Sequence, residues 1–465
     1  MPGWECLFIH DELKLILPVY VDDFKLVGRA ENLPKGWALM EKSGLGLDPP
    51  DPLGDYLGCG QFPIEITPAE QLRRLEHAHP LLEGSVDLSA VKTAQPVRAI
   101  RYNMFGFFQQ CVDVYVELAK VPVESLKKVT TPSIDDHNLK PEDFEQDGAL
   151  AKDAAKIIMK MLYGARLVRF ELLWPICSLA RQVSKWTKAC DKRLHRLVSY
   201  VYHTLDHSLE SFVGDDPALC HPILFSDADF AGEIVGAKST SGCYLAIVGP
   251  NTFAPITASC KKQTCVSHSS TESEIVAAEQ AVRTEGLQAL AFWEFVVDLL
   301  SDTHGAKKMT ETSGKVELNP YSERFDPVRY FASTRRRGPT VTDLIIAEDN
   351  QAVIKIVQKA RSTALRHLPR THRIDLQWLF EVCSNPHVCM RYAGTLQQVA
   401  DLMTKALNKP ETWFHLLEIA QIRGGLTSEA KAVKTQIAGK ALAIQSNECD
   451  SCGFIVSGGQ CACSW

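Results

Sequence analysis

Long hydrophobic runs are missing from this sequence. No apolar stretch approaches the roughly 18 residues that a membrane-spanning helix needs. The N-terminal segment "MPGWECLFIHDELKLILP" carries acidic residues and lacks the basic residues that open a secretory signal peptide. We therefore expect a soluble protein of the cytoplasm or nucleus, with no membrane partner.

Regular cysteine spacing and an excess of positive charge are also missing. The 15 cysteines are an odd number without repeated spacing, which argues against a disulfide framework and for a reducing compartment. The formal net charge is −6, so any nucleic-acid binding must rest on local charge. What the chain does have is 465 residues, 45% of them hydrophobic, enough for about two to four domains with buried cores.

The N-terminal part reads as strands and turns. "KLILPVYVDDFKLVG" (14–28) predicts a strand, a turn and a second strand, with Asp22 and Asp23 in the turn. "DYLGCGQFPIEIT" (55–67) predicts another strand pair, and the pattern from Arg98 to about Val121 is helical. The polar stretch 130–148 is typical of a linker or long loop.

A basic stripe lies within the helical stretch from Ala151 to Leu209. An apolar face opposite the stripe predicts a helix that is buried on one side. The stripe has two interpretations: a solvated charged face, or a surface that contacts a nucleic-acid backbone. Its members are Arg181, Lys185, Lys188, Lys192 and Arg196, and those of the apolar face are Val183, Trp186, Cys190, Leu194, Leu197 and Val201.

From Pro222 onward the pattern changes to alternating strands and helices. "PILFSDADFAG", "GCYLAIVG" and "APITASCKKQTCVS" predict three strands, and residues 269–300 predict a long helix that opens with Ser269 and Glu272 as a capping box. A polar insertion at about 301–340 follows. "DLIIAEDN" and "HVCMRYAG" predict two more strands, separated by helices from Gln351 and around 376–382, and "QQVADLMTKAL" predicts a last helix.

Four carboxylates stand at the ends or starts of these predicted elements, where they can converge. Converging carboxylates repel one another unless cations offset the repulsion, and Mg²⁺ suits oxygen ligands best. Two such ions about 4 Å apart can promote hydrolysis of a phosphodiester. For any one of these residues alone, a role as a cap or turn residue is the favoured interpretation, and the ordered set of four is much more specific. The set, which we expect to be both catalytic and metal-binding with two Mg²⁺ or Mn²⁺ ions, is Asp227, Glu274, Asp349 and Asp401.

Several motifs resemble one family. "FSDADFAGEIVGAKSTSGCYLAIVG", "SCKKQTCVSHSSTESEIVAA", "IIAEDNQAVIKI" and "QVADLMTKAL" resemble the ribonuclease H domain of copia-type retrotransposon Pol polyproteins. "YVDD" followed by "YLGC" resembles the end of their reverse transcriptase palm, and the helical segment from Leu162 to Leu209 resembles their connecting segment. The resemblance covers roughly residues 1–410, in the family's order.

The resemblance implies a mixed α/β fold and a division into domains. It implies a truncated reverse transcriptase palm at 1–105, a helical thumb and connection at 106–215, and a ribonuclease H-like domain with a mixed sheet and flanking helices at 216–410. Residues 411–465 form a tail outside the resemblance. The remainder of a Pol polyprotein is an implied partner.

The resemblance also implies roles for individual residues. Asp227, Glu274, Asp349 and Asp401 align in that order with the four nuclease carboxylates, and Asp22 and Asp23 with the polymerase aspartates. The near neighbours Asp229 and Glu272 are not expected to be ligands. The chain departs from the family pattern at Phe230, at Ile275 and at "RTHRI", which places His372 one position early and Arg373 in the histidine's slot.

The polymerase part is expected to be inactive. A palm needs a third carboxylate on a strand well before the hairpin, and Asp11 and Glu12 lie too close to Tyr20 to supply it. Two metal ligands without a third hold catalytic ions poorly. We therefore predict that this chain alone synthesises no DNA, and that Asp22 and Asp23 form a structural turn.

Four cysteines near the C-terminus form two close pairs. Such pairs can hold Zn²⁺ as a thiolate site, but the second pair is tighter than the usual spacing, and free thiols in a frayed tail are the alternative. The residues are Cys449, Cys452, Cys461 and Cys463.

The expected activity is that of a ribonuclease H-type endonuclease, a metal-dependent hydrolase of the RNA strand of RNA–DNA hybrids. The alternative is a catalytically dead retroelement remnant that binds nucleic acid, or nothing, without turnover. A third option is one piece of a larger polyprotein. The sequence leaves these three open.

Overall fold

The computed structural model describes residues 4–88, 96–232, 237–301, 342–359, 362 and 365–424. The predicted insertion at about 301–340 and the four tail cysteines therefore lie outside the described residues, except Ser301. No helix in these ranges is both long enough and apolar enough to cross a membrane.

A small antiparallel sheet holds the N-terminal residues. Its strands are β1 (Leu7–His10), β2 (Leu15–Tyr20), β3 (Asp23–Phe24) and β4 (Val27–Gly28), so the hairpin predicted for 14–28 is confirmed. Helix α1 (Leu33–Lys42) lies against it through Gly36, whose missing side chain leaves room for Leu15 and Leu26. On the other side, Ile16 packs against Val296 and Leu299 of a helix far along the chain.

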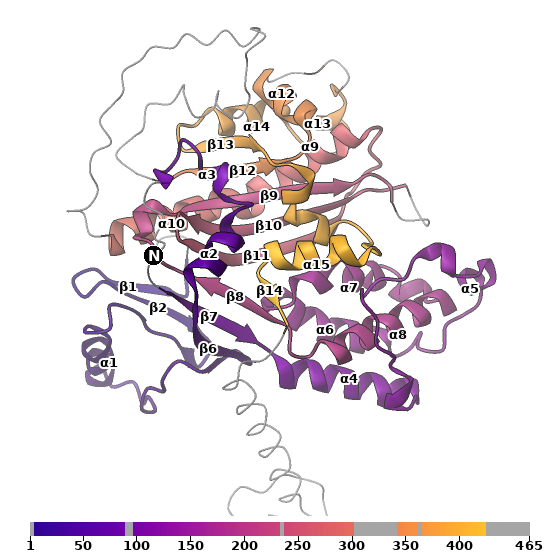
Figure 1. The fold of residues 1–465 in the computed structure, drawn as a ribbon, viewed down its shortest axis with the longest axis horizontal. Coiled ribbons are helices and arrows are strands. Elements are labelled where there is room, and N and C mark those ends of the chain that lie inside the picture. The colour runs from indigo at the N-terminus through magenta and orange to yellow at the C-terminus, as the bar shows by residue number, and fades with distance from the viewer. Residues whose placement is uncertain are drawn as a thin grey trace, which may run out of the picture.

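A large mixed sheet forms the centre of the molecule (Figure 1). The described strands run in the order β13-β12-β9-β10-β11-β8-β7-β6-β5, with β14 beside β8. β12 is parallel to both β9 and β13, and the other pairs are antiparallel, so the expected mixed α/β class is confirmed. The strands are β5 (Asp55–Tyr56), β6 (Cys59–Ile66), β7 (Val97–Asn103), β8 (Ser208–Phe212), β9 (His221–Asp229), β10 (Thr240–Gly249), β11 (Thr252–Lys262), β12 (Leu344–Glu348), β13 (Val388–Tyr392) and β14 (Ile422–Arg423).

Helices pack around this sheet in two groups. The first group gathers beside the antiparallel strands and consists of α4 (Phe105–Ala119), α5 (Pro141–Glu145), α6 (Ala154–Leu167), α7 (Leu173–Ala180) and α8 (Lys188–His203). The second consists of α9 (Ser270–Ala281) and α10 (Leu287–Leu300), which contact β9, and α12 (Gln351–Lys359), α13 (Leu368–Thr371) and α14 (Leu376–Cys383), which lie with the parallel strands. The remaining helices are α2 (Pro68–Leu75), α3 (His79–Leu82) and α15 (Pro410–Ile419).

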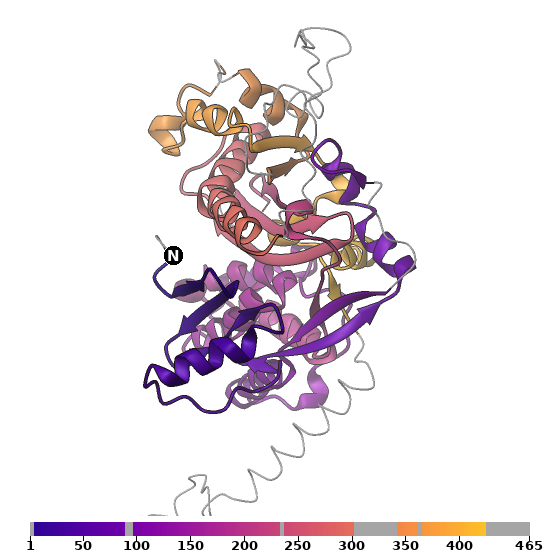
Figure 2. The same cartoon turned by 90° about the vertical axis from the view of Figure 1, so that its left-hand side faces the viewer.

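Helix α10 lies between the small sheet and the parallel strands, since it packs against Ile16 of β2 and also contacts β9 and β12. In Figures 1 and 2 the indigo strands stand at the bottom left and the orange helices at the top. The carboxylate site described below belongs to the upper part, on β9, α9 and β12.

Three predicted elements differ from the structure. The helix predicted from Arg98 begins only at Phe105, because "VRAIRYN" buries alternate side chains and pairs with β6 and β8. The long helix at 269–300 is interrupted by a π-helical turn at Val282–Gly286. The helix expected at "QQVADLMTKAL" is a short 3₁₀ segment, η9 (Val399–Met403).

The large sheet crosses the predicted domain boundaries. β7 pairs with β8, and β8 pairs with β11, so the sheet joins residues on both sides of 105 and of 215. α15 and β14 continue the fold beyond residue 410. The division into domains by function therefore stays a prediction, and the structural unit is larger than any one of the predicted parts.

Candidate metal centre

Three of the four predicted carboxylates meet at the C-terminal ends of the neighbouring strands β9 and β12 of the large sheet. Ala347 of β12 is level with Phe225 of the parallel neighbour β9, so Asp349, just past the end of β12, comes level with Asp227. Helix α9 lies across β9 and brings Glu274 to the same place. One carboxylate oxygen from each of Asp227, Glu274 and Asp349 lies within 4.8 Å of the other two.

The capping of α9 determines which face Glu274 presents. Ser269 precedes the helix and its hydroxyl accepts a hydrogen bond from the Glu272 backbone N–H at 3.1 Å. The Glu272 side chain returns to the His268 N–H at 2.9 Å, which supports the capping role predicted for it. Glu272 is therefore directed away from the three-carboxylate group while Glu274, two residues on, is part of it.

The three carboxylates are electrostatically costly without a cation. Asp227 and Glu274 are buried and Asp349 is half-buried. Burial, and then repulsion from Asp227, raises the pKa of Glu274 from 4.5 to about 11 and raises the pKa of Asp349 above its usual range. Oε2 of Glu274 is buried without a hydrogen-bond partner among the described residues. A divalent cation would offset the repulsion and would also give Oε2 of Glu274 a partner.

Asp401 stands beside this group rather than in it. It lies in η9, which packs on β9 and β10. Gly242 of β10 makes that packing possible, since a Cβ there would lie 2.6 Å from Cγ2 of Thr404 and 2.8 Å from Cβ of Met403. Burial, and then repulsion from Asp227, raises the pKa of Asp401 from 3.8 to about 7.

Lys405 links Asp401 to the group, and the sequence reasoning missed it. Its Nζ donates to Oδ1 of Asp401 at 2.5 Å and to Oδ1 of Asp227 at 3.3 Å. The neighbouring Thr404 hydroxyl also donates to the other oxygen of Asp227. The spacing of Asp401 and Lys405, four residues apart, was a signal for an ion pair. That the same ammonium also reaches Asp227 depends on how η9 docks.

Glu348 is a second residue that the sequence reasoning missed. It ends β12, is fully buried, and accepts hydrogen bonds from the Asn350 N–H at 3.1 Å and the Ser226 hydroxyl at 3.4 Å. Burial raises its pKa well above the usual range, and the charges of Asp349 and Asp227 act in the same direction. In its ionised form this carboxyl would add to the local negative charge that a cation offsets.

His372 does not face the carboxylate group. Its side chain is fully buried, and its Nε2 lies 3.2 Å from Oε1 of Glu272. His367 contacts the same oxygen at 2.9 Å. The two imidazoles therefore hold the segment from Leu365 to Ile374 against the start of α9, where they contact Glu272.

The basic stripe is not one continuous helix, so that prediction is wrong in its geometry. α7 ends at Ala180, Arg181 caps it, and α8 begins only at Lys188, with Trp186 in an extended conformation between them. The break occurs where Thr187 pairs with Asp147 and the chain at Gly148 approaches Trp186 closely. The apolar face is otherwise as expected, since Trp186, Cys190, Leu194, Leu197 and Val201 are buried while Val183 is half-buried.

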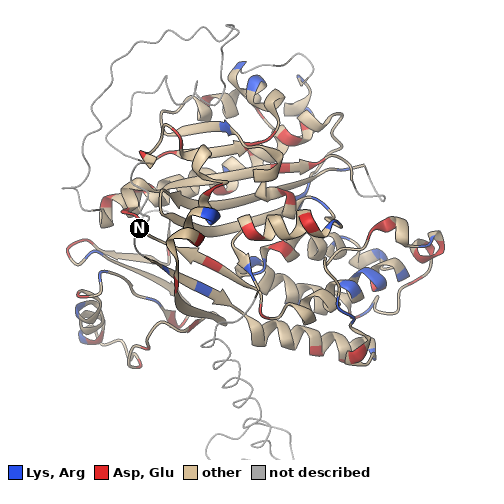
Figure 3. Ribbon diagram, viewed as in Figure 1, with Lys and Arg blue, Asp and Glu red and all other residues tan. Residues whose placement is uncertain are grey.

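The protein's own acidic groups neutralise part of the stripe. Figure 3 shows the basic residues of α8 beside acidic residues of α5. Lys192 and Lys188 both pair with Asp143, and Arg196 donates to the Thr131 carbonyl oxygen at 3.0 Å. Lys185, which is exposed, is the member most accessible to a phosphate. The role of the stripe in nucleic-acid binding stays a prediction.

The hairpin aspartates form no comparable site. Asp22 lies in the turn between β2 and β3, Asp23 begins β3, and both are exposed. Within the described ranges, they belong to no group of three side chains that could hold a metal ion. The expectation that they form only a structural turn stays a prediction.

Comparison with known proteins leaves the family undecided: no protein-family model and no solved structure matches this chain.

Proposed function

We propose that this chain is a retroelement-derived nuclease of the ribonuclease H type, which hydrolyses the RNA strand of RNA–DNA hybrids. The observation that carries the proposal is the meeting of Asp227, Glu274 and Asp349 within 4.8 Å, from a strand, a helix and the end of a parallel neighbouring strand. The copia-type resemblance of the surrounding motifs supports it, and so does Asp401 beside the group. Under this proposal, residues 216–410 form the nuclease part, 1–105 a palm-like part and 106–215 a thumb and connection.

Two Mg²⁺ or Mn²⁺ ions are the proposed cofactors. Asp227, Glu274 and Asp349 would hold them, because carboxylate oxygens are the ligands that these hard cations prefer. When bound, such ions activate the attacking water and stabilise the leaving oxygen of a phosphodiester. Asp401 contributes a further carboxylate at the edge of the group.

The other residues of the site keep this group in position. Lys405 and Thr404 both donate to Asp227, so they orient its carboxylate from the side of η9. Gln398 donates to the Ser226 carbonyl oxygen at 2.9 Å and anchors η9 to β9, one residue from Asp227. We expect discrimination of hybrid from duplex DNA to come from groove shape and 2′-hydroxyl contacts, with an affinity that falls as salt rises.

The experiment is cleavage of a labelled RNA–DNA hybrid by the full chain in Mg²⁺ and in Mn²⁺. Asp349→Asn should lower the rate by a factor of about 100 or more, since a metal ligand is lost. Asp298→Asn, an exposed carboxylate on α10, is the matched control and should cleave at the unchanged rate. A folded wild-type chain that binds hybrid without cutting it would favour the catalytically dead remnant instead.

We further infer that the palm-like hairpin does not polymerise. Asp22 and Asp23 are exposed and outside any three-carboxylate group in the part of the chain that the structure describes. The same preparation should leave a primer on an RNA template unextended when given deoxynucleotides. Extension that Asp23→Asn abolishes would show this inference to be wrong.

A further inference from the structure

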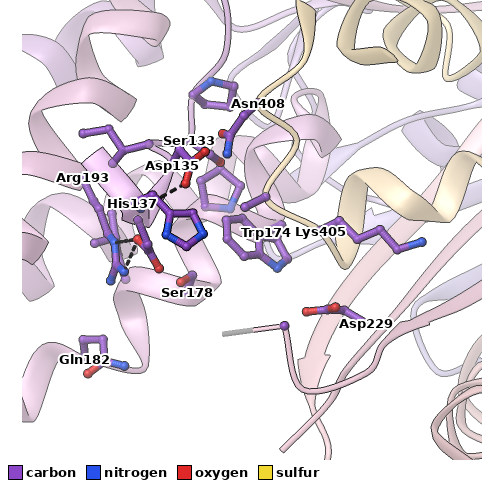
Figure 4. Close-up of a pocket in the computed structure, with 17 residues that line it drawn as sticks. Ser133, Asp135, His137, Trp174, Ser178, Gln182, Arg193, Asp229, Lys405 and Asn408 are labelled. Atoms are coloured by element: carbon purple, nitrogen blue, oxygen red, sulfur yellow. Dashed lines mark hydrogen bonds and ion pairs between the residues drawn. The ribbon is translucent and has the colours of Figure 1, made fainter. Parts of the chain in front are cut away.

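A pocket of about 250 Å³ opens beside the carboxylate group, between the helical part and η9 (Figure 4). One wall is the segment from Pro132 to His137, and the floor is the face of α7 that carries Trp174. The opposite rim holds Asp229, Lys405 and Asn408. Lys405 is shared with the carboxylate group, because it also pairs with Asp227 and Asp401. The pocket is therefore one side chain away from the proposed site of cleavage.

The charge of the pocket does not suit a phosphate. It is lined by three carboxylates, Asp135, Asp136 and Asp229, and by the two cations Arg193 and Lys405. Both cations already have partners: Arg193 lies 2.5 Å from Asp136, and Lys405 pairs with Asp227 and Asp401. An anion inside the pocket would thus meet more negative than positive charge. An uncharged polar ligand avoids this repulsion.

The lining does suit a flat heterocycle. Trp174 supplies an aromatic surface, and its indole N–H is a buried donor with no hydrogen-bond partner within the described residues. The amides of Gln182 and Asn408 and the hydroxyl of Ser178 add both donors and acceptors. The pocket is smaller than the roughly 300–1,000 Å³ of sites for drug-sized ligands, so it has room for about one such ring system.

We propose that this pocket binds one unpaired nucleobase of the substrate nucleic acid, stacked on Trp174, while the adjoining phosphate lies at the carboxylate group. The inference rests on the proposed function, and it names a substrate feature that hybrid cleavage alone does not require. Stacking of bases on aromatic side chains is how proteins commonly hold unpaired nucleotides. The preferred substrate is accordingly a hybrid with an unpaired nucleotide next to the cut.

The test compares two hybrids that differ by one base. Both carry a single-nucleotide bulge in the RNA strand, and in one of them the bulged residue is abasic. Binding is measured by fluorescence anisotropy with the full chain carrying Asp349→Asn, so that no substrate is cut. We expect the hybrid with the base to bind about 5- to 100-fold more tightly than the abasic one, the range typical of loss of one base–aromatic stack.

Two variants locate the effect in the pocket. Trp174→Ala removes the stacking surface, and Ser178→Trp, at a half-buried position on the same face of α7, fills the space. Each should abolish the preference for the base, whereas Trp174→Phe should retain most of it. Equal binding of the two hybrids by the unaltered pocket would overturn the proposal, and so would a preference that survives both variants.

The result separates the pocket from the nuclease. A base preference in a chain whose wild type cuts no hybrid would support the pocket and refute the proposed function. Efficient cutting by a chain that binds both hybrids equally would support the proposed function and refute the pocket.

Discussion

At the scale of single residues, the protein concentrates buried negative charge at one point. Glu274, Asp227 and Glu348 are all buried, and burial raises the pKa of Glu274 to about 11 and of Asp401 to about 7. A carboxyl whose pKa is higher in the folded than in the unfolded state binds more protons when folded, so its contribution to stability is lost as pH rises. Without divalent cations the carboxylate group should therefore destabilise the fold at neutral pH.

Glu274→Gln should stabilise the cation-free protein. Near pH 4, below the unfolded pKa of about 4.5, the variant and wild type should have similar free energies of unfolding. As pH rises, the free energy of unfolding of the variant should exceed that of wild type by a growing amount, about 1–3 kcal/mol at pH 7. The reason is that folded wild type must either keep the proton on Glu274 or bear a repelled charge there, whereas the amide of the variant does neither. The measurement is thermal or urea unfolding in EDTA from pH 4 to pH 8.

Magnesium should reduce or reverse the difference in stability between Glu274→Gln and wild type. A cation that binds only the folded state stabilises wild type by mass action, and Glu274→Gln removes one of its ligands. The variant's advantage at pH 7 should shrink or change sign in millimolar Mg²⁺. An advantage that is the same at every pH, with or without Mg²⁺, would contradict the electrostatic explanation.

At the scale of elements, the site depends on how the short segment η9 docks on the sheet. η9 carries Asp401 and leads directly into Thr404 and Lys405, and it lies over Gly242 of β10. A glycine is needed here for space rather than for backbone freedom, since any Cβ would contact Thr404 and Met403 at less than 3 Å. The docking of η9 and the orientation of Asp227 are therefore coupled.

Gly242→Ala should reduce cleavage more than it reduces stability. The added methyl group pushes η9 away and separates Lys405 and Thr404 from Asp227, at a cost of about 1–3 kcal/mol for overpacking. We expect the rate of hybrid cleavage to fall by a factor of about 10 or more in a chain that still folds. Gly46→Ala is the matched control, because nothing lies within 4 Å of its Cβ. Equal rates for the two variants would show that the position of η9 does not matter.

At the scale of the whole molecule, one sheet connects parts that the family resemblance assigns to different domains. Glu210 of β8 is fully buried and accepts from Arg74 at 2.6 Å and from Arg101 at 2.7 Å, which join α2 and β7 to β8. Farther along the sheet, Arg391 of β13 donates to the carbonyl oxygen of Leu81 in α3. Residues before 105 therefore help to hold strands that lie after 206.

Glu210→Ala should destabilise both regions together. The variant removes the buried carboxylate that Arg74 and Arg101 share, although Arg74 keeps its pairing with Glu70, and we expect a loss of about 3–5 kcal/mol. Hydrogen exchange should become faster in β6 and β7 and also in β8 and β11, since they share one sheet. Glu65→Ala, at an exposed position on β6, should leave exchange unchanged. Faster exchange confined to β6 and β7 would instead indicate that the predicted domains unfold independently.

The local features of this protein were predictable from its residue pattern. The alternation of apolar residues predicted the hairpin at 14–28, and the apolar runs before Asp227 and Asp349 predicted β9 and β12, because side-chain periodicity follows from the geometry of each element. The position of Glu274 near the start of a helix followed from the cap at Ser269. The residues of the three-carboxylate group could therefore be chosen before their distances were known.

Only the tertiary structure decided which distant segments meet. The break between α7 and α8 depends on the pairing of Thr187 with Asp147, and the strand at 97–103 depends on its pairing with β6 and β8. Lys405 reaches Asp227 only because Gly242 lets η9 approach. These contacts join residues far apart in the chain, and their free energies come from burial and pairing that no local pattern of residues contains.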